Sequence, residues 1–230
     1  MVQTAIHTAI KNVLKARFFR LDNPKIKAMI MYSGGADSLA LAKGLLESTT
    51  HQILIHHVII KNNEKRDDFQ LQMLEEQMKF LRNNCRKFEL IKSTFEMQIG
   101  NKAGGLDISL SLFMGARACL ALNNNISLIH TGHLLRTAPT DMYEGIAVMN
   151  SVFTNKRFKP IWLCPLRGLN AASAKKEIYK SIGKKGLELT VSCREPKFNN
   201  GKFESCLCCH ACKTRATAIK ELDWSQSLVK

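Results

Sequence analysis

The chain has 230 residues, 45% of them hydrophobic, which is long and apolar enough to bury one substantial core. We therefore expect a single domain over residues 1–230. No apolar run approaches the roughly 20 residues of a membrane span, and Lys11, Lys15, Arg17 and Arg20 interrupt the first apolar segment, so we expect neither a membrane helix nor a signal peptide. The formal net charge of +15 implies an anionic partner.

Two alternatives account for this charge. Basic residues gather between Lys11 and Arg20 and again in a second group, without the interleaved aromatic residues of a single-strand-binding surface: Lys175, Lys176, Lys180, Lys184 and Lys185. They form either the solvated surface of a protein that handles a small anionic ligand or a surface that binds nucleic acid. Charge alone leaves both open.

The predicted elements alternate along the chain. An N-terminal extension, residues 1–26, has the helical spacing of Ile6, Ile10, Val13, Leu14 and Phe18. The next segments alternate between strand and helix patterns: strand 28–32, helix 38–46, strand 53–60, helix 68–82, strand 87–92, helix 110–122 and strand 127–131. The pattern then weakens: residues 159–163 form a short strand or an extended run, and a helix over 171–182 ends at Gly183.

This alternation predicts an α/β fold with a doubly wound, mostly parallel sheet and right-handed crossovers. Ligands of such sheets bind outside the carboxyl ends of the strands, where the strand order reverses. The site should therefore lie on the loops that follow Tyr32, Ile60, Lys92 and Thr131.

The first of these loops is glycine-rich and reads Ser33-Gly34-Gly35-Ala36-Asp37-Ser38. Its position between a strand and a helix offers free backbone N–H groups and the positive end of a helix to an anion, and its glycines let the backbone approach phosphate oxygens. Asp37 would repel a bare phosphate, but it fits if Mg²⁺ lies between its carboxylate and the phosphates. The lysine of a Walker A loop and the third glycine of a dinucleotide fingerprint are both missing.

The bland alternative is an ordinary strand-to-helix turn in which Asp37 or Ser38 caps the helix. The string SGGxDS between an apolar strand and an apolar-periodic helix nevertheless resembles the PP-loop superfamily of ATP pyrophosphatases. That resemblance implies the PP-loop ATPase fold, similar to the adenine nucleotide α-hydrolases, and chemistry in which ATP transfers AMP to a substrate oxygen. Ser33, Gly34, Gly35, Ala36, Asp37 and Ser38 would then bind the ATP phosphates.

The C-terminal tail, residues 190–222, contains a cysteine cluster. Of the eight cysteines, Cys206, Cys209 and Cys212 have CxxCxxC spacing, and Cys193 lies upstream as a fourth ligand. Four thiolates suit tetrahedral Zn²⁺, with an iron–sulfur cluster as the alternative. Cys208 and His210 are possible intruders in the ligand set, whereas Cys85, Cys119 and Cys164 belong to apolar surroundings. A local metal site of this kind indicates a reducing compartment, and we expect a cytoplasmic protein.

The combination of SGGADS near the start with Thr190-Val191-Ser192-Cys193 and CxxCxxCxxR, Cys206 to Arg215, near the end resembles the 7-cyano-7-deazaguanine synthase family. Looser likeness runs over residues 27–222 through Thr131-Gly132-His133, Pro139, Glu144, and Cys164-Pro165-Leu166 followed by Lys175, Lys176 and Glu177. It implies a zinc-bound tail, a homodimer, and a ligase that converts 7-carboxy-7-deazaguanine, ammonia and ATP into an amide and then a nitrile. Such products are used to modify nucleic acid, as in queuosine biosynthesis.

Three loops depart from that family's pattern. This chain has Lys61-Asn62-Asn63-Glu64-Lys65-Arg66, Leu106-Asp107 and Thr140-Asp141-Met142 where the family carries other strings. These loops face the substrate in that family. The resemblance therefore implies ATP binding more firmly than it implies a purine-like substrate. The alternatives are a tRNA-modifying PP-loop enzyme of the thiolation or lysidine type, an enzyme acting on another acid, and a nucleotide sensor that does not cleave ATP.

Six further residues have predicted roles. His133 follows a strand and is a candidate on the substrate side, against a structural histidine. Asp141 and Glu144 lie one helical step apart and are candidates for a purine edge or Mg²⁺, against a charge effect at a helix start. Arg215 is expected to support the metal site. His56 and His57, inside an apolar strand, are expected to be structural.

Overall fold

The computed structural model describes residues 23–61, 66–96, 107–122, 125–132, 139–154, 156, 158–166, 171–193 and 195–222. The helix expected around Ile6 to Phe18 lies outside these residues. The described elements are β1 (Lys27–Tyr32), α2 (Ala36–Ser48), β2 (Gln52–Lys61), α3 (Arg66–Asn84), β3 (Glu89–Glu96), α4 (Asp107–Ala121), β4 (Leu128–Thr131), α5 (Pro139–Val152), β5 (Ile161–Leu163), α6 (Ala171–Leu189), β6 (Lys197–Asn199), β7 (Lys202–Glu204) and α7 (His210–Glu221).

The main sheet is parallel throughout and has the order β3-β2-β1-β4-β5. From β1 the chain moves outward to β2 and β3 and then crosses back to β4 and β5. The strand order therefore reverses between β1 and β4, which is the switch point where open α/β sheets bind ligands. The predicted α/β fold with a doubly wound parallel sheet is confirmed.

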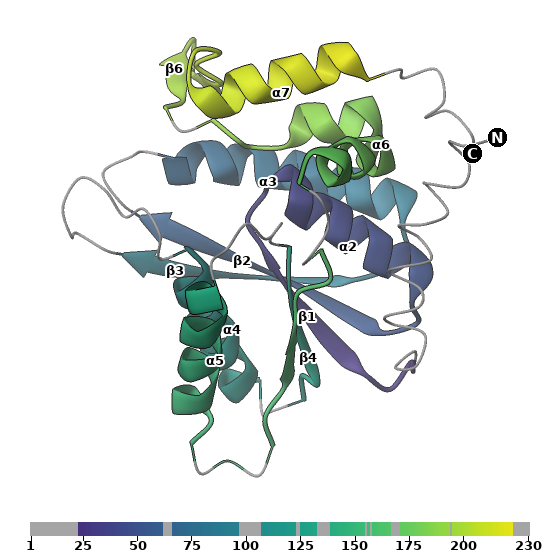
Figure 1. Cartoon of the computed structure of the whole chain (residues 1–230), viewed down its shortest axis with the longest axis vertical. Helices are drawn as coiled ribbons and strands as arrows, with labels where there is room; N and C mark the ends of the chain where they lie inside the picture. Colours follow the sequence, from purple (N-terminus) through teal and green to yellow (C-terminus); the bar gives the residue numbers. More distant parts are fainter. Residues whose placement is uncertain are drawn as a thin grey trace.

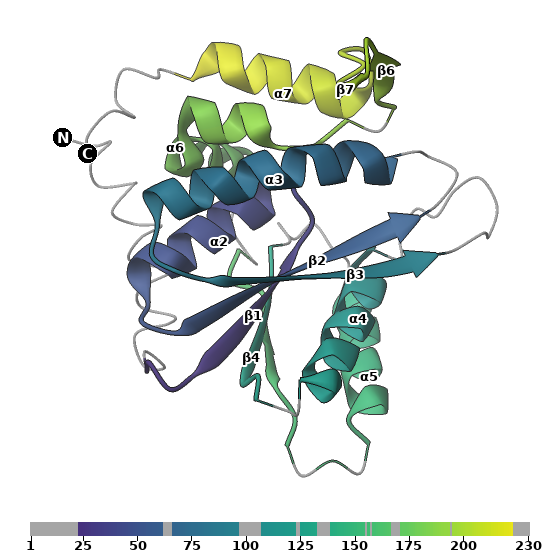
Figure 2. The same ribbon diagram turned by 180° about the vertical axis from the view of Figure 1, so that it is seen from behind.

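Both faces of the sheet are buried at its central strands β1 and β4, as their apolar runs require, whereas the edge strands β3 and β5 are only partly covered. In β1, Ala28, Ile30 and Tyr32 point into the core beneath α2, α3 and α6, while Met29 and Met31 point into the core beneath α4 and α5. Figure 1 and Figure 2 show these two sets of helices on opposite sides of the sheet.

The tail adds an outer layer on the side of α2 and α3. Helix α6 packs on α2, and α7 lies beyond α6 (Figure 1). Leu222, at the end of α7, joins the same core cluster as Tyr32. The short antiparallel pair β6–β7 contacts α3 through β7. The tail is thus fixed to the helix layer rather than to the sheet.

Two predicted boundaries were wrong. Strand β3 continues from Glu89 to Glu96, so Lys92 lies inside the strand and no loop follows it; the alternation of half-buried and exposed residues continues because β3 is paired along its length to β2. Gly183 does break the helix, with φ of 71° and ψ of 174°, but a second helical segment follows it to Leu189. Leu187, in this second segment, is buried, and its burial holds the segment against the core.

Within the described residues, no helix is long and apolar enough to cross a membrane.

The contact at the switch point gives a first prediction. A Cβ added at Gly132, just after β4, would lie 3.1 Å from the carbonyl carbon and oxygen of Asp37 and from Cα of Ser38. Backbone atoms at a helix start cannot move aside as a flexible side chain can, so we expect Gly132→Ala to destabilise the protein by about 1–3 kcal/mol. Urea unfolding monitored by circular dichroism measures this, and an unchanged midpoint would contradict the close packing of the two loops.

Candidate nucleotide loop and cysteine cluster

The glycine-rich loop joins β1 to α2 at the switch point. Gly34 has φ of +78°, a left-handed conformation that glycine adopts without strain. Gly35 is the N-cap residue of α2, in an extended conformation, and no side chain makes a capping hydrogen bond there. The first backbone N–H groups of α2 therefore have no side-chain acceptor at the cap and point out of the helix start, where an anion can accept from them.

The two serines of the loop bond to each other and to the backbone. The Ser33 hydroxyl lies 3.2 Å from the Ser38 hydroxyl, and the Ser38 hydroxyl donates to the Gly35 carbonyl at 3.0 Å. Ser33 is exposed and Ser38 is buried. The alternative in which Asp37 or Ser38 caps α2 is not what the structure shows, because the capping position belongs to Gly35.

Asp37 lies in the first turn of α2 and is mostly buried. Burial raises the pKa of its carboxyl from 3.8 to about 6, and the positive charge of Lys175 on α6 opposes this shift. The Asp37 charge in turn contributes to raising the pKa of Tyr179, although burial is the larger cause. An acidic side chain placed where its charge is costly, beside a helix start and one lysine, has the environment of a cation ligand or of a functional acid.

Helix α6 therefore contributes residues to the site. No pattern in the sequence indicated that Tyr179 is one of them. Lys175 and Tyr179 are one helical turn apart on α6, and both interact electrostatically with Asp37. Lys175 was expected as a member of a basic group and as part of the likeness to the 7-cyano-7-deazaguanine synthase family, without a role of its own. Because it lies beside the loop, Lys175 can contact a bound phosphate. The sequence pattern alone does not distinguish Lys175 from Lys176 or Lys180 in this respect.

The four predicted cysteine ligands come together. Ligand atoms of Cys193, Cys206, Cys209 and Cys212 all lie within 4.8 Å of one another, and the sulfurs of Cys206 and Cys212 are 4.0 Å apart. With zinc–sulfur bonds of about 2.3 Å, a tetrahedral site has sulfurs about 3.8 Å apart. The spacing fits one ion at the centre and is too long for a disulfide.

Backbone N–H groups donate to these sulfurs and favour the thiolate form that binds a metal. The N–H of Cys206 lies 3.2 Å from the sulfur of Cys193, and the N–H of Cys209 lies 3.3 Å from the sulfur of Cys206. Such donation lowers the pKa of the Cys206 thiol. Neither possible intruder belongs to the group, since Cys208 is exposed and His210 begins α7 on the surface.

Arg215 anchors the tail through three backbone carbonyls. Its guanidinium donates to the carbonyls of Leu187, Glu188 and Thr190, at 2.8 Å for Glu188 and 2.6 Å for Thr190. These are carbonyls at and just after the end of α6, which lack partners inside the helix. Arg215 thereby ties α7 to the segment that leads into Cys193.

The remaining predicted residues are only partly placed. His133 lies outside the described residues. Asp141 belongs to the first turn of α5, but its side chain is not described, and Glu144 is exposed one turn later. The segment from Asn62 to Lys65 is likewise outside, so the roles of the substrate-facing loops stay predictions.

His56 and His57 are buried within β2. A ring nitrogen of His56 lies 2.8 Å from the Ser93 hydroxyl, and His57 Nδ1 lies 2.8 Å from the Tyr32 carbonyl. Burial lowers the pKa of both, to about 4 for His56, with the neighbouring His57 adding to the effect there. Both rings are therefore neutral at pH 7, as expected for structural histidines.

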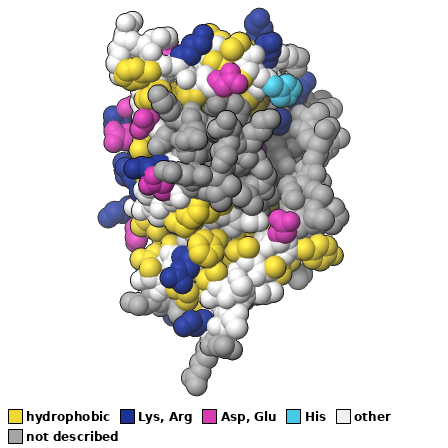
Figure 3. Space-filling model, turned by 90° about the vertical axis from the view of Figure 1, so that its left-hand side faces the viewer, with side chains coloured by type: hydrophobic (Ala, Val, Ile, Leu, Met, Phe, Trp, Pro, Cys, Tyr) yellow, Lys and Arg dark blue, Asp and Glu magenta, His cyan; other side chains and the backbone are white. Residues whose placement is uncertain are grey.

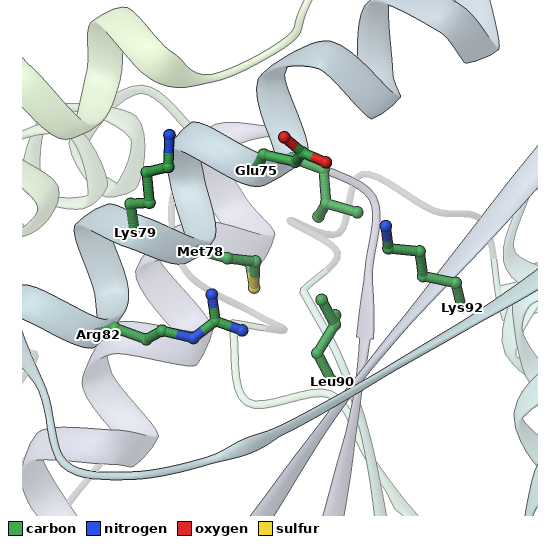
Figure 4. A pocket seen from close by; sticks show the side chains of 7 residues that line it. Glu75, Met78, Lys79, Arg82, Leu90 and Lys92 are labelled. Atoms are coloured by element: carbon green, nitrogen blue, oxygen red, sulfur yellow. The ribbon is translucent and has the colours of Figure 1, made fainter.

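A cavity of about 280 Å³ lies away from the loop, between α3 and the edge strand β3. Figure 4 shows Lys79, Arg82 and Lys92 around it, over Met78 and Leu90. Lys79 is paired with Glu76 at 2.7 Å, and Arg82 lies over the Phe88 ring. A charged residue on an edge strand also discourages pairing with another sheet.

On the face drawn in Figure 3, basic side chains are scattered among acidic and hydrophobic ones rather than gathered into one patch.

No protein-family model and no curated protein sequence matches the chain. Solved structures do match it. The U34-tRNA thiolase NcsA from Methanococcus maripaludis, solved with its 4Fe-4S cluster, is 16% identical, with 93% of this chain and 70% of that chain covered and a TM-score of 0.52. A 4-thiouridine synthetase in a complex with RNA and ATP is 17% identical, with 84% and 50% covered and a TM-score of 0.44.

At 16% identity the likeness to NcsA shows the fold alone, and it confirms the predicted PP-loop ATPase fold. NcsA is a thiolase and not a 7-cyano-7-deazaguanine synthase, so membership of the latter family stays a prediction. The expected homodimer also stays a prediction.

Asp37 gives a prediction with a defined sign. Its folded-state pKa of about 6 is above the unfolded value of 3.8, so the folded, metal-free protein is fully stabilised below pH 3.8 and loses that contribution as the pH rises through 6. Asp37→Asn removes the buried charge, and we expect it to stabilise the metal-free protein by about 1–3 kcal/mol at pH 8, with the gain shrinking toward pH 4. Urea unfolding in EDTA over this pH range is the measurement.

Asp68→Asn, at an exposed position on α3, is the matched control and should change stability little at any of these pH values. A loss of stability in Asp37→Asn at pH 8 would show that the carboxylate is a structural group and not a strained functional one.

The cysteine cluster gives a third prediction, with its control in the same loop. We expect about one metal ion per chain in purified protein, loss of that ion in Cys209→Ser, and full retention in Cys208→Ser, because Cys208 is exposed and is not a member of the group. Elemental analysis of both variants measures this. Equal loss of metal from the two variants would contradict the assigned ligand set.

Proposed function

We propose that this protein is an ATP-dependent enzyme that transfers AMP to an oxygen atom of a nucleobase-type substrate and releases pyrophosphate. The observation that carries the proposal is the mostly buried Asp37 carboxylate in the first turn of α2, at a helix start that no side chain caps and at the switch point of the sheet. N–H donors serve the phosphates, and the carboxylate serves a cation that accompanies them.

In the proposed first step the substrate oxygen attacks the α-phosphorus, the bond from that phosphorus to the oxygen bridging to the β-phosphorus breaks, and pyrophosphate leaves. The N–H groups at the start of α2 would hold phosphate oxygens in line for this attack, and the hydroxyls of Ser33 and Ser38 would turn from their present acceptors to donate to phosphate as well. Lys175 adds positive charge beside the loop. Mg²⁺ held by Asp37 would neutralise the leaving pyrophosphate.

In the second step a nucleophile attacks the activated carbon, the carbon–oxygen bond breaks, and AMP leaves with the substrate's oxygen. The loop and its donors do not determine which nucleophile is used. Sulfur would give a thiolated base, and ammonia or an amine would give a carbon–nitrogen bond.

Our first candidate for the substrate is a base in tRNA. NcsA, which has the same fold, is a U34-tRNA thiolase, and the net charge of +15 suits a polyanionic partner. The fold comparison supports this candidate. The loops that depart from the 7-cyano-7-deazaguanine synthase pattern give it no further support.

A second candidate is free 7-carboxy-7-deazaguanine, aminated to the amide and then dehydrated to the nitrile by a second adenylation. The specific observation in its favour is the cysteine cluster. Its ligand atoms lie within 4.8 Å of one another, a compact spacing that supports a single tetrahedral Zn²⁺ over a larger 4Fe-4S cluster such as that of NcsA. The tail sequence from Thr190 to Arg215 favours the same candidate.

ATP–pyrophosphate exchange tests the proposal and separates the candidates. We expect exchange of labelled pyrophosphate into ATP that depends on added substrate, with either bulk tRNA or 7-carboxy-7-deazaguanine supporting it. Exchange that also weakens steeply with added salt would identify the tRNA candidate, because phosphate contacts release counterions. Mass spectrometry with ammonium present identifies an amide or a nitrile.

Asp37→Asn should abolish exchange while the tail keeps its metal, and Asp68→Asn should leave exchange unchanged. Binding of ATP without exchange in the presence of either substrate would overturn the proposal in favour of a nucleotide sensor.

A further inference from the structure

The carbonyl oxygen of Gly34 in the nucleotide loop is held by two donors from distant parts of the chain. The backbone N–H of Val191 donates to it at 2.9 Å, and the side-chain Nε2 of Gln77 donates to it at 3.0 Å. Val191 is part of the tail, and Gln77 lies on α3. Both residues are buried, with Gln77 fully so.

The hydrogen bonds of the Gln77 side-chain amide fix its orientation. Its Oε1 accepts from the Tyr32 hydroxyl at 2.6 Å, and its Nε2 donates both to Gly34 and to the Leu189 carbonyl, the latter at 2.7 Å. Carbonyl oxygens only accept, so the NH₂ group must face Gly34 and Leu189. The amide therefore bridges the end of β1, the loop and the end of α6.

The tail segment on the other side of this bridge is short and anchored at both ends. Arg215 holds the carbonyl of Thr190, and Cys193, two residues after Val191, is one of the four clustered cysteines. A change in the position of Cys193 thus moves the Val191 N–H that donates to the loop.

The held carbonyl has a consequence for the next peptide N–H. In a trans peptide unit the carbonyl oxygen and the following N–H point in opposite directions. With the Gly34 oxygen turned toward Gln77 and Val191, the Gly35 N–H points away from them; its nearest acceptor is the Ser33 hydroxyl at a long 3.4 Å. The donors of Gln77 and Val191, on one side of the loop, therefore orient the Gly35 N–H toward the opposite side.

We propose that Gln77 is a positioning residue for the nucleotide loop, and that Gln77 and the Leu189–Cys193 segment together keep the Gly35 N–H turned toward the ATP phosphates. Metal binding by the cysteine cluster then sets the affinity for ATP from behind the loop. This inference rests on the proposed function, since it assumes that the loop binds ATP.

The test measures binding rather than turnover. A non-hydrolysable ATP analogue with a methylene group between the α- and β-phosphorus atoms is titrated with Mg²⁺ into metal-loaded protein in a calorimeter. Gln77→Met keeps the length and volume of the side chain but removes both donors. We expect it to bind the analogue about tenfold more weakly or worse, since a buried carbonyl loses one of its two partners.

Gln72→Leu is the matched control. Gln72 also lies on α3 and also bonds to the tail, through both backbone groups of Phe203, but it has no contact with the loop. It should leave the affinity for the analogue unchanged. Tyr32→Phe, which removes only the bond that orients the amide, should weaken binding less than Gln77→Met and covers the case in which that variant does not fold.

Removing the metal from wild-type protein gives an independent arm. We expect chelation to weaken analogue binding by a similar factor while the far-ultraviolet circular dichroism of the sheet and its helices persists. In exchange assays, Gln77→Met should raise KM for ATP more than it lowers kcat, whereas a general loss of folded protein lowers only the apparent kcat.

Wild-type affinity in a folded Gln77→Met or Tyr32→Phe protein together with wild-type affinity after chelation would overturn the inference and leave the proposed function standing. Absence of analogue binding by the metal-loaded wild type would instead overturn the proposed function, and this inference with it.

Discussion

The reversal of strand order between β1 and β4 is the constraint on which the rest of the site depends. Because β1 connects outward to one side and β4 to the other, the loops that follow them meet at the carboxyl edge of the sheet. Gly132 brings the second loop so close that a single methyl group would touch the backbone of Asp37 and Ser38. The start of α2 is therefore held from in front by β4 and from behind by α3 and the tail.

That arrangement explains how a buried carboxylate and uncapped N–H groups persist side by side. The strain of burying Asp37 is offset by the packing of α2 on the sheet and on α6, with Leu39, Leu41 and Leu45 among its fully buried residues. Similar packing supports the tail, whose own strands are exposed and three residues long. By binding a metal ion, the four cysteines would stabilise this part of the chain, where little apolar surface is available for burial, as in small metal-stabilised segments.

Sequence patterns predicted those parts that local chemistry determines. The buried parallel strands, the glycine loop and the ligand set of the cysteine cluster all follow from residue type and spacing, and the structure confirms the fold and brings the four cysteines together. The end of β3 and the helical segment after Gly183 were missed because tertiary burial decides them. Gln77 gave no signal at all: a glutamine in the middle of a charged helix is ordinary until its three partners, from residues 32, 34 and 189, are seen around it.

The central claim is that the loop directs ATP cleavage between the α- and β-phosphates. Phosphorus NMR of a reaction with ATP, Mg²⁺, ammonium or a sulfur donor, and whichever substrate supports exchange tests it most directly. The account predicts AMP and pyrophosphate in equal amounts, both absent without substrate. Formation of ADP and inorganic phosphate would contradict it, because that outcome requires attack at the γ-phosphorus.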